Sequence, residues 1–124
     1  MVIGLLKEQQ PETRVSLLPE HVASVLKWNA TLLVESGAGL TAFASDDAYA
    51  KAGANICSRN DVLQQADLIL TMHPPADSDL QAMGGKTLLG FFQVLFQTAF
   101  VRACCEKQIT LFSMDMLPRT TRAQ

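Results

Sequence analysis

Apolar residues along the chain gather in short runs that alternate with segments of helical spacing. The runs that predict buried strands cover residues 2–6, 30–35, 54–57, 67–72, 86–92 and 109–114. Helix signals fall between them, at residues 19–29, 45–52, 60–66, 77–83 and 96–106. Strands that alternate with helices predict an α/β fold, a Rossmann-like (flavodoxin-like), mostly parallel sheet with helices on both faces.

The helix signals include caps and one clear apolar stripe. Pro19 suits the first position of a helix whose spacing runs from Val22 to Asn29, although Leu18 before it is a poor N-cap. Ser45 and the two aspartates after it are expected to cap a helix that ends at Gly53. The clearest stripe, with spacing i, i+3, i+4, i+7 and i+8, comprises Phe96, Ala99, Phe100, Ala103 and Cys104.

The series of predicted elements ends on the strand of residues 109–114. No later helix signal follows that could cover the sheet face beside this strand. Residues 115–124 bring a proline, two arginines and a glutamine together at the chain terminus, where loops are poorly held. We therefore expect residues 1–124 to form a single truncated lobe, the front part of a larger protein.

Composition narrows the class of protein. The 124 residues are 48% hydrophobic and 18% charged, which suits a compact domain and argues against disorder. A net charge of −2 gives no basic footprint for nucleic acid, and the longest apolar stretches are too short to span a bilayer. The three cysteines and two histidines lack metal-ligand spacing, so no metal is expected. The adjacent Cys104 and Cys105 favour packing inside a helix over a redox pair, although their role stays open.

A glycine motif follows the second predicted strand. Residues 37–42 read Gly-Ala-Gly-Leu-Thr-Ala and match the outline of the dinucleotide fingerprint G-x-G-x-x-A. That fingerprint needs a helix that begins inside the motif, so that its N-terminal amides face the pyrophosphate. Here the first capping signal comes at Ser45, no helix start is expected before it, and no acidic residue closes the next strand. We therefore interpret the motif as a glycine-rich turn.

Four segments, in this order, resemble one family. They are IGLLKEQQPETRVSLLPEHV from residue 3, LLVESGAGLTAFASDDAYAKAGANI from residue 32, ADLILTMHPP from residue 66 and MDMLPRTTRAQ from residue 114. Over essentially its whole length the chain is similar to the N-terminal domain shared by alanine dehydrogenases and the alpha subunits of proton-translocating NAD(P) transhydrogenases. The resemblance implies that residues 1–124 form an α/β lobe beside a separate NAD-binding Rossmann domain, which is absent from this chain.

The alanine dehydrogenase branch of this family implies a keto-acid site. Its chemistry needs cations for a carboxylate and a proton donor for a carbonyl, and the branch supplies an arginine, a lysine and a histidine. Arg14 matches the arginine, but His73 stands at the lysine position and Gln93 at the histidine position. A glutamine supplies no proton, and a histidine is a weaker and only partly charged substitute for a lysine. Two of these three substrate-cleft candidates therefore depart from the branch.

The last residues of the chain favour the transhydrogenase branch. Direct hydride transfer between two nicotinamide rings needs no acid or base, only rings held at near-attack distance. The loop of this branch reads Pro-Arg-x-x-Arg-Ala-Gln before an aspartate, and residues 118–124 match it as far as the glutamine. The resemblance implies that Arg119, Arg122 and Gln124 bind the cofactor NAD(H) in the complete protein. We expect no catalytic residue on this chain alone and no tight NAD(H) binding to it.

Individual residues keep a plainer interpretation beside the functional one. Arg14 lies either at the mouth of the cleft or in solvent, paired with Glu12 or Glu8. His73 comes at the carboxyl end of a strand, where open α/β sheets bind ligands, although a lone histidine is more often structural. Lys7 and Glu8 belong to a motif shared by both branches, and a charged loop pair is an adequate account of them.

Three functions stay open. The first is the N-terminal lobe of a transhydrogenase alpha subunit, one wall of a cleft for hydride transfer from NADH to NADP⁺ coupled to proton translocation. Its implied partners are the rest of the alpha subunit and the NADP-binding and membrane components, in a complete protein that is a cytoplasmic homodimer peripheral to the inner membrane. The second is an alanine-dehydrogenase-like NAD-dependent oxidoreductase with an altered substrate site. The third is a non-catalytic, stand-alone lobe.

Overall fold

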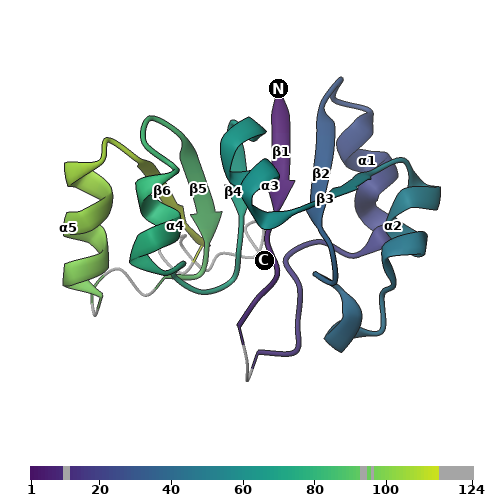
Figure 1. The fold of residues 1–124 in the computed structure, drawn as a ribbon, viewed down its shortest axis with the longest axis horizontal. Helices are drawn as coiled ribbons and strands as arrows, with labels where there is room; N and C mark the ends of the chain where they lie inside the picture. Colours follow the sequence, from purple (N-terminus) through teal and green to yellow (C-terminus); the bar gives the residue numbers. More distant parts are fainter. Residues whose placement is uncertain (10–11, 93–94, 96, 115–124) are drawn as a thin grey trace, which may run out of the picture.

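The computed structural model describes residues 1–9, 12–92, 95 and 97–114. Its strands form one six-stranded sheet in the order β3-β2-β1-β4-β5-β6, in which every neighbouring pair is parallel (Figure 1). The α/β prediction of a parallel sheet is confirmed. Of the two common doubly wound orders, this is the Rossmann order and not the flavodoxin-like one. The strands are β1 (Val2–Leu5), β2 (Thr31–Glu35), β3 (Asn55–Cys57), β4 (Leu68–Leu70), β5 (Thr87–Gly90) and β6 (Thr110–Ser113).

Helices connect the strands and are short. In the part of the chain that the structure describes they are η1 (Pro19–His21), α1 (Val22–Leu26), η2 (Leu40–Ala42), α2 (Asp46–Ala52), α3 (Arg59–Gln65), α4 (Asp77–Gln81) and α5 (Thr98–Glu106), where η marks a 3-10 turn. Each predicted strand and helix has a counterpart, usually trimmed by one or two residues at its ends. The trimming arises because parallel pairing extends over only three or four residues, whereas the apolar runs continue into buried loop positions such as Leu6 and Phe92.

The first helix differs from its prediction. Pro19 opens a 3-10 turn, α1 follows from Val22, and the side chain of Leu18 makes no capping bond. The helix ends at Leu26, so the prediction that Asn29 continues the helical stripe is wrong. Asn29 has a left-handed φ of 58° in the turn before β2, a conformation that asparagine tolerates better than most residues.

The caps predicted for α2 are confirmed, and the stripe predicted for α5 is confirmed in part. The Ser45 hydroxyl accepts a bond from the N–H of Ala48, and Gly53 ends α2 with a left-handed φ of 111°. In α5, Phe100 and Cys104 are buried against the sheet. Of the other predicted stripe residues, Ala103 is half-buried, Ala99 is exposed, and Phe96 lies outside the described residues.

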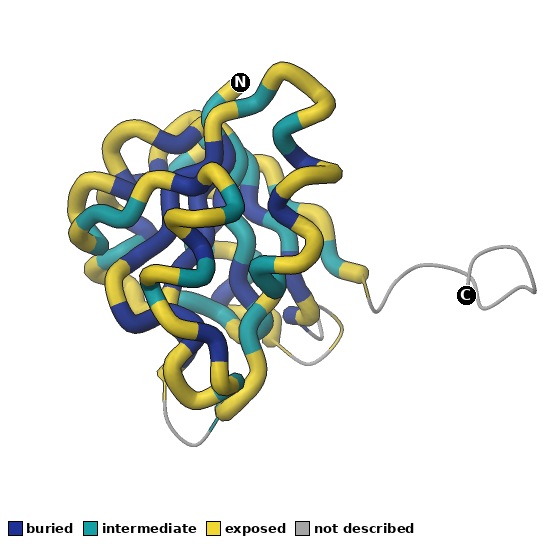
Figure 2. The backbone as a smooth tube through the Cα atoms, turned by 90° about the vertical axis from the view of Figure 1, so that its right-hand side faces the viewer, coloured by how far each residue is buried: buried dark blue, intermediate teal, exposed yellow. Residues whose placement is uncertain are grey.

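Side chains alternate between the two faces of the sheet and build two separate cores. One core packs α1 and α2 against the β3-β2-β1 half of one face, and its buried members include Ile3, Leu5, Val22, Val25, Leu32, Val34 and Tyr49. The other core packs α3, α4 and α5 against the opposite face, with Leu33, Val62, Ile69, Leu80, Leu88, Phe100 and Cys104 among its members. Figure 1 shows α1 and α2 grouped at one end of the sheet and α4 and α5 at the other. Figure 2 shows the buried residues running through the centre of the molecule and the exposed ones at its periphery.

This two-sided arrangement follows from the path of the chain. The chain winds outward from β1 to β3, crosses back, and continues from β4 to β6 in the other direction. Because parallel crossovers are right-handed, the reversal moves the later helices to the opposite face. The face of β4, β5 and β6 that points away from those helices therefore receives no helix from the described residues.

That face carries an open apolar groove of about 530 Å³ beside β6. Its lining includes Met1, Leu68, Leu89, Phe112 and Met114, and Phe112 is 58% exposed. The sequence predicts an uncovered sheet face beside the last strand, and the described residues leave such a face.

The glycine motif of residues 37–42 forms a tight turn after β2. Gly37 has a left-handed φ of 83°, which favours glycine, and a Cβ on Gly39 would lie only 2.7 Å from the carbonyl oxygen of Ala44. The prediction that no helix starts before Ser45 is wrong in one respect, because the 3-10 turn η2 begins directly after Gly39. A dinucleotide fingerprint follows the first strand of a Rossmann sheet, whereas these glycines follow the second. Both glycines are thus accounted for by turn geometry and close packing.

Candidate functional site

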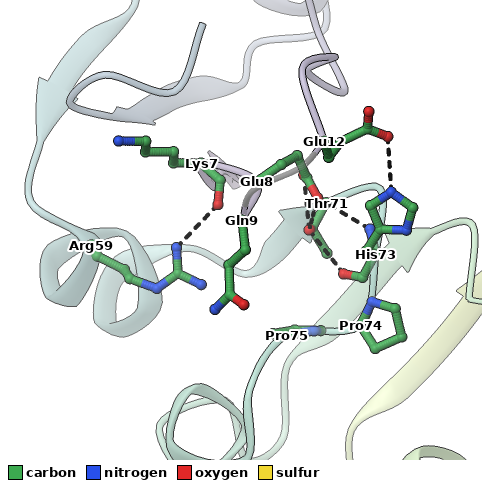
Figure 3. A pocket seen from close by; sticks show the side chains of 9 residues that line it. All are labelled: Lys7, Glu8, Gln9, Glu12, Arg59, Thr71, His73, Pro74 and Pro75. Atoms are coloured by element: carbon green, nitrogen blue, oxygen red, sulfur yellow. Dashed lines mark hydrogen bonds and ion pairs between the residues drawn. The ribbon is translucent and has the colours of Figure 1, made fainter. Parts of the chain in front are cut away.

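The sheet changes its winding direction between β1 and β4, and such switch points are where open α/β sheets bind ligands. At the carboxyl ends of these two strands the loops enclose a cavity of about 420 Å³. We call it the switch-point crevice, and its lining comprises Lys7, Glu8, Gln9, Glu12, Arg59, Thr71, His73, Pro74 and Pro75 (Figure 3). Most of these side chains are polar, so the crevice is the candidate functional site.

Glu8 joins the loop after β1 to the loop after β4. Its carboxylate accepts the backbone N–H of Met72 at 2.8 Å, the backbone N–H of His73 at 3.1 Å and the hydroxyl of Thr71 at 3.0 Å. Glu8 is only 8% exposed, and Thr71 is buried beside it. The interpretation of Lys7 and Glu8 as a charged loop pair is therefore wrong for Glu8, whose carboxylate is buried and bonded to another strand's loop.

Arg59, at the start of α3, ties three other segments together beside the crevice. Its guanidinium donates two bonds to Asp79 of α4, at 2.6 and 3.1 Å, and one to Glu35 at the end of β2, at 2.6 Å. It also donates to the carbonyl oxygen of Lys7 at 3.3 Å. The carboxylates of Asp79 and Glu35 raise the pKa of Arg59 above its usual value, and the hydrogen bonds to Asp79 are the largest cause. The network fixes α3, α4 and the ends of β1 and β2 relative to one another.

Glu12 holds two of the predicted cleft residues at the outer rim of the crevice. Its Oε1 accepts a bond from Arg14 Nη2 at 2.7 Å and lies 2.8 Å from His73 Nε2. The Arg14 guanidinium, and after it the His73 ring, lowers the pKa of Glu12 from 4.5 to about 2. The same contact raises the pKa of Arg14. The pairing of Arg14 with Glu12 that the plainer interpretation expected is observed, and the arginine side chain is 68% exposed. This pairing does not remove Arg14 from the cleft, because Arg14 also lines a cavity beside His73.

A second cavity, of about 400 Å³, lies on the other side of His73. Its lining comprises Arg14, Met72, His73, Pro74, Phe91, Phe92 and Gln97. The structure therefore brings Arg14 and His73 together, as a shared cleft requires. The remaining predicted site residues, Gln93, Arg119, Arg122 and Gln124, lie outside the described residues.

Sequence reasoning missed two residues that organise the crevice. Thr71 gave a weak signal, because it is a lone hydroxyl at the carboxyl end of an apolar run. Arg59 gave none, since an arginine after a serine cap looks like any solvated first-turn residue. Its partners Glu35 and Asp79 lie 24 and 20 residues away in the sequence, so only the tertiary structure reveals the network.

A metal site, a membrane-spanning helix or a reactive thiol within residues 1–9, 12–92, 95 and 97–114 would each indicate another chemistry. No three histidine, cysteine, aspartate or glutamate side chains gather there as a metal site. None of the helices in these ranges has the length and apolar character to cross a membrane. The three cysteines are free, and burial raises the pKa of the Cys104 thiol, which lowers its reactivity and agrees with a packing role.

The fold is that of an α/β domain with a Rossmann-type parallel sheet, and the crevice at its switch point is a candidate ligand site. The family model of the alanine dehydrogenase/PNT N-terminal domain matches residues 4–124, so the chain belongs to this family. The resemblance found in the sequence motifs is thereby confirmed.

The chain is similar to members of both branches. The NAD(P) transhydrogenase subunit alpha of Cereibacter sphaeroides is 33% identical over 127 residues, which cover 100% of this chain and 24% of that subunit. The alanine dehydrogenase of Staphylococcus saprophyticus is 29% identical over 111 residues, which cover 88% of this chain and 30% of that enzyme. Among solved structures, a transhydrogenase from Sinorhizobium meliloti matches with a TM-score of 0.95 and 29% identity, covering 100% of this chain and 38% of that chain. The chain thus spans 24% to 38% of the length of these relatives.

Proposed function

We propose that this chain forms one wall of the NAD(H) cleft of an NAD(P) transhydrogenase alpha subunit. In that assembly the nicotinamide of NADH supplies the hydride that reduces NADP⁺, and the transfer is coupled to proton translocation through a membrane component. The chain's own contribution is to shape and orient the wall, while a separate Rossmann domain holds the dinucleotide. Residues 1–124 alone are then inactive.

The observation that carries the proposal is the state of the polar groups around the crevice. Glu8 is bonded to the loop after β4, Arg59 is bonded to two carboxylates, and Glu12 engages both Arg14 and His73. A site that reduces a keto acid needs an uncommitted cation for the carboxylate and a proton donor for the carbonyl. Transfer between two nicotinamides needs only a rigid surface that sets the approach of the rings, and the mutually bonded groups of Glu8, Arg59 and Glu12 supply such a surface. The Lys7 ammonium, which also lines the crevice, makes no hydrogen bond or ion pair with the described residues.

The proposal extends to residues and partners beyond the crevice. Arg119, Arg122 and Gln124 are the proposed nicotinamide contacts, on the strength of their match to the transhydrogenase loop. The proposed partners are the rest of an alpha subunit, an NADP-binding component and a membrane component. The complete protein is then a homodimer on the cytoplasmic side of the inner membrane.

One observation favours a second function, that of an alanine-dehydrogenase-like oxidoreductase. Arg14 and His73, which stand at two of the three keto-acid positions, line the same cavity of about 400 Å³. Release of Arg14 from Glu12 would give that cavity a cation for a carboxylate. Gln93 at the third position still lacks a proton to donate.

The test uses the intact native polypeptide, whose mass is measured first by mass spectrometry. Its activity is then assayed with NADH and an NADP⁺ analogue in membrane vesicles, and separately with pyruvate, ammonium and NADH. We expect hydride transfer in the first assay and none in the second. Activity only with pyruvate would replace the proposal by the second function, and calorimetry showing no NADH binding would leave a non-catalytic lobe.

The proposed nicotinamide contacts of residues 118–124 are tested in the same intact polypeptide. Arg119→Ala and Gln124→Ala should each weaken NADH binding by about tenfold, the effect of one lost hydrogen bond to a charged or polar ligand group. The matched control is Arg102→Ala, because Arg102 is an exposed residue of α5. Equal affinities for all three variants would remove these residues from the site.

A further inference from the structure

The bonds of Glu8 span the switch point itself. β1 and β4 are neighbouring parallel strands, and Glu8 follows the first while its donors follow the second (Figure 3). Its Oε2 accepts the N–H of Met72 and its Oε1 accepts the N–H of His73, so each oxygen holds one of two consecutive amides. The Thr71 hydroxyl lies between both oxygens and the carbonyl oxygen of His73.

We infer that Glu8 is a positioning residue, which fixes the backbone of residues 71–73 and thereby aims the His73 ring at Glu12 and into the crevice. The inference rests on the proposed function of the crevice as a cofactor wall. His73 precedes two prolines, whose φ is fixed, and its backbone is itself restricted by the proline after it. With Glu8 on one side and Pro74 on the other, the His73 backbone has little freedom, which fixes the direction of its Cα–Cβ bond. From that position the ring reaches Glu12 Oε1 at 2.8 Å, and this contact holds its orientation.

No other side chain of similar size reproduces this set of bonds. A glutamine has one oxygen and one NH₂ group, so either orientation of its amide turns a donor toward one of the two backbone N–H groups. The N–H that loses its acceptor lies in a half-buried loop, where an unmet donor costs free energy. Aspartate keeps both oxygens but is one methylene shorter and reaches neither amide without a shift of the backbone.

The first experiment reads the position of His73 directly by NMR on the 124-residue chain. Glu8→Gln should shift the Met72 and His73 amide resonances upfield and change the His73 ring signals that report its contact with Glu12. His21 is an exposed histidine in η1, and its ring signals should stay unchanged as the internal reference. Glu20→Gln removes an equivalent charge from an exposed residue of η1 and is the matched control.

A second variant protects the test against a folding failure. Thr71→Val removes one of the three donors while both backbone bonds are kept, so it should move the same resonances in the same direction by a smaller amount. Unchanged His73 ring signals in a folded Glu8→Gln or Thr71→Val variant would overturn the inference. Equal changes in the Glu20→Gln control would do the same.

The second experiment measures NADH affinity in the intact native polypeptide. Glu8→Gln should raise the Kd for NADH by about tenfold or more, while Glu20→Gln leaves it unchanged. If the unmodified polypeptide binds no NADH, the proposed function fails, whereas the NMR result on His73 still decides whether Glu8 positions the loop. If the polypeptide binds NADH and Glu8→Gln binds equally well with its His73 ring displaced, the positioning role in the cleft is refuted.

Discussion

Replacement of Arg59 by methionine would test whether the network beside the crevice holds the lobe together. Methionine keeps an unbranched apolar stem of similar length but removes all the donors of the guanidinium. Glu35 and Asp79 would lose the cation that they share, and their side chains are only 10% and 13% exposed. The backbone carbonyl of Lys7 would lose a donor as well.

The expected loss follows from the number and burial of these contacts. A hydrogen bond to a charged group contributes about 1.5–3 kcal/mol, and breaking a buried ion pair by removing one partner costs about 3–5 kcal/mol. Arg59 is itself 29% exposed, so water screens the freed carboxylates and the lower end applies. We therefore expect a fall of about 3 kcal/mol in the free energy of unfolding, out of a typical total of about 5–15 kcal/mol.

Urea denaturation followed by circular dichroism measures this loss. With a slope of about 1.5 kcal/mol per molar urea, the midpoint should fall by about 2 M. Arg102→Met is the matched control, because it removes an arginine from the exposed surface of α5. A loss below about 0.5 kcal/mol for Arg59→Met, equal to that of the control, would show that the network contributes no more than an ordinary surface ion pair and would refute the reasoning.

The remaining predictions concern packing, acid stability and a buried hydroxyl. Gly39→Ala should lower the free energy of unfolding by about 1–3 kcal/mol in urea denaturation, because the added Cβ meets the Ala44 carbonyl. Gly84→Ala, whose Cβ would lie 3.5 Å from its nearest neighbour, should cost less. Equal losses for the two variants would contradict the packing argument. Since the folded-state pKa of Glu12 is lowered to about 2, its contribution is present above pH 4.5 and lost as pH falls toward 2. Glu12→Gln should therefore lose less stability than the unmodified chain between pH 6 and pH 3, as urea midpoints would show, and parallel curves would speak against it. The Tyr49 hydroxyl donates to the backbone carbonyl oxygen of Leu17 at 2.6 Å, so Tyr49→Phe should lower the free energy of unfolding by about 1 kcal/mol. Thermal melts measure this loss, and an unchanged melting temperature would show that the bond adds no stability.

Much of the fold could be predicted from the sequence because its signals are local. The caps of α2 depend on Ser45 and Gly53, which act within one turn of the helix, and both appear as expected. Strand boundaries were less accurate, since DLILTM predicts six residues whereas β4 pairs over only three, Leu68–Leu70. The length of a strand is set by its neighbours in the sheet, and local composition does not contain that information.

The candidate site was predictable only where a residue's type carried the signal. Arg14 and His73 attract attention as a cation and an imidazole in proline-punctuated loops, and the structure places both beside one cavity. Glu8 looked like a solvated partner of Lys7, because nothing nearby in the sequence indicates that its carboxylate is buried. Its acceptor role depends on Thr71 and the amides after it, 63 to 65 residues further along the chain.

By itself the sequence determined the alternation of strands and helices, the caps, the glycine turn and the family, since each of these is read over a few neighbouring residues or in the order of short motifs. The tertiary structure alone decided that β1 lies beside β4, and with it where the winding reverses, which sheet face stays open and which carboxylates become buried. The physical reason is that pairing between distant strands depends on the free energy of the whole packed sheet, to which each residue contributes only a small part.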